Sequence, residues 1–231
     1  KILFKSCHKI FSEVEKTRDL LMKTKKYPEL IRVGSTVEFG VSVLLKGMEV
    51  FFETHPDIHV DFAFSHNLFQ LLLDDELDLI IDCKPHVRPD IETITLFQEE
   101  YAVIASPRYI RRQNITTVED LARCNVFSQD KELAWWDNFI HILPLDQQVL
   151  FDRVTRINHV RGMINGALCN MGVAFVPRYT VLRELEEGHL VALFPELDIL
   201  NDHINIYLKS RNLLLKKFQY LIEHIKEFRL Q

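Results

Sequence analysis

"NHVRGMINGALCNMGVAFVP", residues 158–177, places a helical pattern and a strand pattern on either side of one tight turn. The apolar residues of its first part fall on one helical face: Val160, Met163, Ile164, Ala167 and Leu168. Asn170 and Gly172 follow where the chain must reverse, and both tolerate left-handed backbone geometry. "VAFV" is typical of a short buried strand and ends at Pro177. We predict a helix–turn–strand unit and interpret it as part of a ligand-sensing fold.

Arg161 lies at the start of this predicted helix. Its positive charge opposes the helix dipole there, an unfavourable contribution of about 0.3–1 kcal/mol. Three explanations remain open for such a cation: it binds a ligand, it pairs with an acidic neighbour, or it is simply solvated.

Upstream of this unit, strand and helix patterns alternate. Strands are predicted at 30–34 ("LIRVG"), 59–64 ("HVDFAF") and 77–81 ("LDLII"), with helices at 37–53 and 67–75 between them. This alternation predicts an α/β fold with a mostly parallel sheet and helices on its faces.

A long predicted strand, 93–105, leads into a second set of elements, and a strand at 203–208 and an amphipathic helix at 213–228 close the chain. The second set comprises helices near 118–122, 133–142 and 179–187 and strands near 124–128, 149–157 and 190–193. A chain of 231 residues with 47% apolar residues is long enough for two such units, each with its own core.

Charge is distributed unevenly along the chain. Residues 1–26 hold eight basic and three acidic residues, a net charge of +5. Since the whole chain has a net charge of −5, the remainder carries −10. The basic arm indicates an anionic neighbour or, alternatively, a solvated helix face. The same segment repeats apolar residues at alternating spacings of four and three, as in a coiled-coil seam: Leu3, Cys7, Ile10, Val14 and Leu21. We predict a dimerisation helix; an amphipathic helix lying on its own domain is the alternative.

Other bulk features limit the class of protein. No apolar run approaches the roughly 20 residues of a membrane span. Four widely spaced cysteines without a C-x-x-C pair fit reduced thiols in a cytoplasmic protein better than a disulfide framework. The chain begins at Lys1, which suggests a fragment of a longer protein.

Several stretches resemble LysR-type transcriptional regulators. "NMGVAFVP" is similar to the family's Gly-x-Gly-hydrophobic-Pro hinge, with Asn170 at the first glycine. Other similar landmarks occur in the family's order: "IRVG" followed by an apolar helix with "FG", "FFETHPDIHVDF", "LLLDDELDLII" with Asp75 at a usual glycine, "TTVEDLA" and "LEEGHLVAL". Each landmark alone is weak, but their shared order and spacing are specific.

The resemblance implies an α/β, two-lobed, periplasmic-binding-protein-like (type II) domain with an N-terminal linker helix. Residues 1–26 would form the linker and dimerisation helix, residues 27–104 plus 202–231 the first lobe, and residues 105–201 the second. The family's winged helix-turn-helix, which binds promoter DNA, would be missing from this chain. The expected partners are a small-molecule effector, further copies of the chain in a dimer or tetramer, and promoter DNA through the missing domain.

The effector would bind between the lobes, where strands end and helices begin. The positions that meet this description are Ser35, Thr36, Glu38, Ser65, His66, Asp82, Lys84, Ser128, Trp135, His159, Val160, Arg161 and Phe175. Glu38 departs from the family, which often has Ser or Thr there. Its carboxylate would repel an anionic effector and favour an amine, or it would only cap the helix through its charge.

Two other functions remain to be weighed. A solute-binding protein of a transporter has the same bilobal fold, but it would not need the seam at residues 3–21. An enzyme on this fold would turn over a metabolite, yet the sequence has no G-x-S-x-G, P-loop, dinucleotide or H-E-x-x-H motif. No cofactor or metal ion is implied, and His55 and His59 are separated by a turn. Cys83 is a candidate for a redox role.

Overall fold

The computed structural model describes residues 14, 29–130, 132–197 and 199–228. The predicted dimerisation helix, with Leu3, Cys7, Ile10 and Leu21, therefore lies outside the described residues, apart from Val14, which is helical and exposed. That prediction remains untested.

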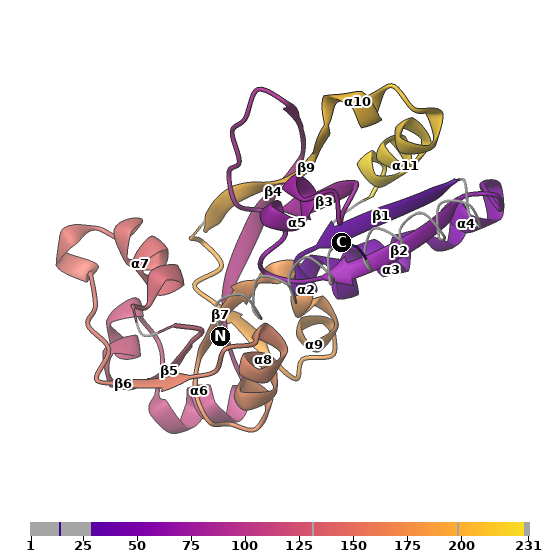
Figure 1. Cartoon of the computed structure of the whole chain (residues 1–231). Coiled ribbons are helices and arrows are strands. Elements are labelled where there is room, and N and C mark those ends of the chain that lie inside the picture. The colour runs from indigo at the N-terminus through magenta and orange to yellow at the C-terminus, as the bar shows by residue number, and fades with distance from the viewer. Residues whose placement is uncertain (1–13, 15–28, 131, 198, 229–231) are drawn as a thin grey trace, which may run out of the picture.

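The first part of the chain builds one side of a mixed sheet (Figure 1). Strand β1 (Leu30–Ser35) pairs in parallel with β2 (His59–Phe64) and with β3 (Leu79–Asp82). All four residues of β3 are buried, as expected for a central strand covered on both faces.

The predicted helix 37–53 is helical over nearly that range, but it is not one regular α-helix. It consists of α2 (Val37–Phe39), the π-helical turn η1 (Gly40–Leu44), α3 (Leu45–Gly47) and α4 (Glu49–Thr54). A Cβ at Gly40 would lie 2.4 Å from the ring of Phe64, so this glycine lets the segment lie close on β2. Helix α5 (Phe69–Leu73) is shorter than the predicted 67–75.

Two long strands connect the halves of the molecule. The start of β4 (Ile91–Ala105) pairs with β9 (Leu200–Lys209), and its end pairs with β7 (Ala174–Pro177) and β8 (Val191–Leu193). All these pairings are antiparallel, as is the pairing of β3 with β9. The three strands from which a mostly parallel sheet was expected do pair in parallel, but the whole sheet is mixed, because the connecting strands β4 and β9 run in opposite directions. The strand order is β2-β1-β3-β9-β4-β7, with β8 also on β4.

The remaining elements belong to the second half and the C-terminus. Strands β5 (Asn125–Ser128) and β6 (Arg153–Arg156) form a parallel pair. The helices and helical turns are α6 (Pro107–Gln113), η2 (Val118–Arg123), α7 (Ala134–His141), η3 (Leu145–Gln147), α8 (Val160–Leu168), η4 (Arg178–Thr180), α9 (Leu182–Glu186), α10 (Ser210–Leu213) and α11 (Lys216–Lys226).

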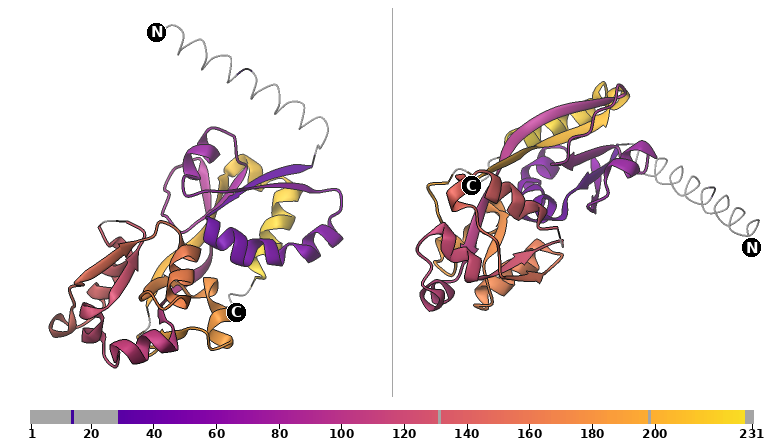
Figure 2. Two further views of the ribbon diagram at one scale, coloured as in Figure 1. Left: turned by 90° about the horizontal axis from the view of Figure 1, so that it is seen from below. Right: turned by 90° about the vertical axis from the view of Figure 1, so that its left-hand side faces the viewer.

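The buried apolar residues separate into cores on either side of the connecting strands. The helical segment 37–54 and α11 cover one face of β1 and β3, and α5 covers the other. Two further clusters surround β5, β7 and α8. Figure 2 shows the two halves at opposite ends of the β4–β9 ribbon. We call them the first and second lobe, and we retain the boundaries 27–104 plus 202–231 and 105–201 as a proposal.

The opening helix–turn–strand unit is present as predicted: α8 ends at Leu168, and β7 begins at Ala174. Asn170 has a left-handed φ of 59°. Its side-chain oxygen accepts a hydrogen bond from Ser106 Oγ at 2.8 Å. Gly172 has a different role: a Cβ there would lie 2.3 Å from the backbone oxygen of Asn125, so a side chain would force β5 away from the turn.

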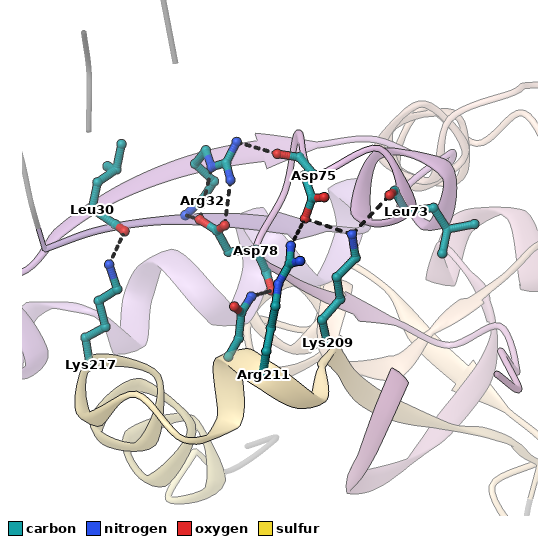
Figure 3. Close-up of polar contacts among 9 residues, drawn as sticks. Leu30, Arg32, Leu73, Asp75, Asp78, Lys209, Arg211 and Lys217 are labelled. Carbon is teal, nitrogen blue, oxygen red and sulfur yellow. Dashed lines mark hydrogen bonds and ion pairs between the residues drawn. The ribbon is translucent and has the colours of Figure 1, made fainter. Parts of the chain in front are cut away.

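A polar network joins the C-terminal segment to the rest of the first lobe (Figure 3). Arg32 binds both carboxylate oxygens of Asp78, at 2.6 and 3.0 Å, and donates to the backbone oxygen of Asp75 at 2.6 Å. The carboxylate of Asp75 binds Lys209 at 2.7 Å and also pairs with Arg211. Asp75 has a φ of 58°, a geometry for which glycine is better suited.

Within the described residues, no helix combines the length and the apolar character needed to cross a membrane.

Candidate functional site

A cavity of about 870 Å³ lies between the helical segment 37–47 of the first lobe and α8, η4 and α9 of the second. This volume suits a small organic molecule. Apolar groups from both sides line it: Val37, Val41, Val43, Val160, Ile164, Leu182 and Phe228. Of the predicted effector-binding residues, this wall contains Glu38, His159, Val160 and Arg161.

Glu38 lies within α2, directly at the cavity. Its Oε1 is shut off from solvent and has no hydrogen-bond partner among the described residues. Thr36, the residue before the helix, makes no side-chain capping bond. A closed-off carboxylate oxygen without a donor is unfavourable, which distinguishes Glu38 from a solvated surface residue.

Arg161 pairs with an acidic neighbour, one of the three explanations left open by the sequence. Its Nη1 donates to Glu184 Oε1 at 2.6 Å, across from α8 to α9. The guanidinium is half exposed, whereas Glu184 is buried. His159, the residue before α8, is exposed at the cavity, and Val160 is buried beside it.

Tyr179 is the feature of the site that the sequence did not reveal. It comes from η4 in the second lobe, yet its ring lies edge-on to Phe39 at 6.1 Å within the core of the first. Its hydroxyl donates to Glu99 Oε1 at 2.9 Å. Burial, together with the charge of Glu99, raises the pKa of Tyr179 well above its ordinary value, so the phenol stays protonated. Only its position after Pro177, at a strand end, offered a signal.

Six of the predicted residues gather at the carboxyl ends of β1, β2 and β3 but do not line the cavity: Ser35, Thr36, Ser65, His66, Asp82 and Lys84. The Ser65 amide donates to the Ser35 backbone oxygen at 3.0 Å, and Lys84 Nζ donates to the His66 backbone oxygen at 3.1 Å. Ser35 Oγ is buried and has no partner among the described residues. The predicted convergence of strand ends is present at this edge of the sheet.

The charged groups beside this edge already have hydrogen-bond or ion-pair partners. Asp82 accepts from the Lys84 amide at 3.2 Å and lies 3.0 Å from His86 Nε2. Burial, with the charges of Glu99 and Asp82, raises the pKa of Cys83 to about 12. A protonated thiol is a poor nucleophile, which weighs against a redox role for Cys83.

The other predicted residues of the second lobe do not line the cavity. Ser128 is buried at the end of β5, and Trp135 is half-buried, edge-on to Tyr101 at 5.2 Å. Phe175 is buried in the core of this lobe, with its ring 5.3 Å from that of Trp136. We therefore remove Phe175 from the candidate site. The sequence could not show which face of β7 the ring would occupy, because all four residues of that strand are buried.

Comparison with known proteins identifies the family. Residues 27–229 match the model of the LysR substrate binding domain, so the chain belongs to that family. The uncharacterized HTH-type transcriptional regulator YusT of Bacillus subtilis is 23% identical over 198 residues, which are 84% of this chain and 64% of YusT. The chain thus spans about two thirds of that relative's length.

Solved structures show the same fold. The regulatory domain of CrgA from Neisseria meningitidis matches with a TM-score of 0.71 at 18% identity, covering 86% of this chain and 97% of CrgA's domain. The effector domain of AmpR from Pseudomonas aeruginosa matches with a TM-score of 0.72 at 18% identity, covering 86% and 94%. The α/β, two-lobed, periplasmic-binding-protein-like fold expected from the sequence is therefore confirmed.

Proposed function

We propose that this chain is the effector-binding regulatory part of a LysR-type transcriptional regulator and that it senses a small molecule in the cavity between its lobes. The observation that carries this proposal is the cavity itself, because its wall combines Glu38 of the first lobe with His159 and Arg161 of the second. Membership of the LysR substrate binding domain family supports it.

The fold offers a way to convert binding into movement. The lobes are joined by β4 and β9, whose pairing is irregular between Thr95 and Phe97 and between Gln98 and Glu100. A ligand that contacts both lobes binds best in one relative orientation, and so shifts the population toward it. The chain acts in this scheme as a binding module and not as an enzyme.

The whole protein would act on transcription. We infer that it binds promoter DNA through a winged helix-turn-helix outside this chain, self-associates as a dimer or tetramer through residues 1–26, and works in the cytoplasm. The relative YusT is described as an HTH-type transcriptional regulator, which supports this inference.

A thermal-shift screen of small metabolites tests the sensing proposal. Binding to the native state adds about 2.7 kcal/mol of stability at a 100-fold excess over Kd, so an effector should raise the melting temperature. Val41→Trp would fill the cavity from its exposed wall and should abolish the shift. Val87→Trp, at a surface residue outside the cavity wall, is the matched control and should preserve it. A shift that survives Val41→Trp would place the ligand elsewhere, and a screen without any stabilising compound would refute the sensing function.

A further inference from the structure

One carboxylate in the cavity wall has no hydrogen-bond donor among the residues that the structure describes. Glu38 Oε1 is closed to solvent and meets no donor among the described residues. Without a ligand, this unsatisfied oxygen lowers the stability of the folded protein. Because Glu38 lines the cavity, a turn of its side chain would bring this oxygen to a ligand's N–H group, which would remove that cost and add a charge-assisted hydrogen bond.

The guanidinium groups of the cavity wall are already engaged. Arg161 is held by Glu184 at 2.6 Å, and Arg183 is held by Glu187 at 2.8 Å. Neither is bound to Glu38, and the carboxylate beside each one already offsets part of its positive charge. Lys46 also lines the wall, but it is exposed, so water screens its charge.

The surroundings of Glu38 add further negative charge. The buried side chain of Glu99 lies next to Tyr179, whose hydroxyl it already binds at 2.9 Å. The charges of Glu99 and Glu38 both act on Tyr179 and help to raise its pKa. The hydroxyl of Tyr179 is committed to Glu99, so it is not a donor for Glu38.

The rest of the wall is suited to an apolar body. Val37, Val41, Ile164 and Leu182 face the same cavity as Glu38. We propose that the cavity takes a small organic cation, a protonated amine on an apolar body, and that Glu38 binds its ammonium group. This proposal rests on the proposed function and specifies the class of its ligand.

The test compares ligands that share one body and differ in charge. The aromatic set is 2-phenylethylamine, 2-phenylethanol and phenylacetate, and the aliphatic set is hexylamine, hexanol and hexanoate. Primary amines are protonated at pH 7, since their pKa lies near that of lysine. Titration calorimetry on the 231-residue chain should show that, in at least one set, the amine binds more tightly than the alcohol and the carboxylate.

Two variants assign the preference to Glu38. Glu38→Gln should weaken amine binding about 10- to 100-fold, the value of a hydrogen bond to a charged group, and leave alcohol binding unchanged. Glu49→Gln removes the same charge from an exposed position in α4, outside the cavity wall, and should retain amine affinity.

The proposal is overturned if neither amine binds more tightly than its alcohol, absence of binding included, or if Glu38→Gln leaves amine affinity intact. Its failure is distinguishable from failure of the sensing function. A carboxylate ligand that binds tightly and is lost in Val41→Trp would refute the cationic class while preserving the cavity as a sensor.

Discussion

The carboxylates of Asp78 and Glu38 are the same chemical group in two differently built regions of the first lobe. Asp78 is 19% exposed, and Arg32 covers both of its oxygens (Figure 3). Glu38 has an oxygen that is closed off and lacks any donor among the described residues. The ion pair of Asp78 stabilises the fold, whereas the closed-off oxygen of Glu38 does not. Mutations at the two regions should therefore change the free energy of unfolding in opposite directions.

The largest effect should be chemical and should lie at Cys83, which follows β3 in the same lobe. Burial raises the pKa of this thiol to about 12, so at pH 8 far less of it is thiolate than in an exposed cysteine. We expect alkylation by iodoacetamide, followed by mass spectrometry, to be correspondingly slow in the native protein and fast in urea. Cys169, which is exposed, controls for reagent access. Equal rates for Cys83 in native and unfolded protein would show that its surroundings are not desolvated.

The largest loss of stability should come from the paired region. Arg32→Met leaves Asp78 without its guanidinium and should lower the free energy of unfolding by about 2 kcal/mol. Urea denaturation measures this. Arg88→Met removes an equivalent pair with Asp90 at an exposed site and should change little. Similar losses in both variants would mean that burial does not distinguish the network.

Glu38→Gln should act in the opposite direction. Without ligand, removing a charge that has no hydrogen-bond donor among the described residues should leave the free energy of unfolding unchanged or raise it by up to about 1 kcal/mol. The same urea experiment decides the sign. A loss comparable to that in Arg32→Met would indicate that Glu38 has a structural partner, and the comparison would no longer hold.

The smallest effect should be at Asp75, inside the network but half exposed. Asp75→Gly loses the ion pairs with Lys209 and Arg211, which solvent screens, and relaxes a left-handed backbone. The net change should stay within about 0.5 kcal/mol and shrink further at high salt. A larger loss, independent of salt, would show that Asp75 is a rigid part of the network.

The order of helices and strands could be predicted because apolar periodicity and turn residues are local properties. The reversal at Asn170 was correctly placed for that reason. The antiparallel pairing of β4 with β9 could not be predicted in this way, since it joins segments about a hundred positions apart. Local patterns likewise placed Glu38 and Arg161 at the cavity. They missed Tyr179 and Phe228, because these residues reach the site only when η4 and the segment after α11 pack against the helical segment 37–54.

Tyr179 has a mechanical consequence for the two lobes. Its ring is fixed among the apolar side chains of the first lobe, while its backbone belongs to the second. Separating the lobes at this point would expose the ring and break its hydrogen bond to Glu99. We expect them to turn about this ring as about a pivot, with small displacements near η4 and the largest at the distal rims of the molecule.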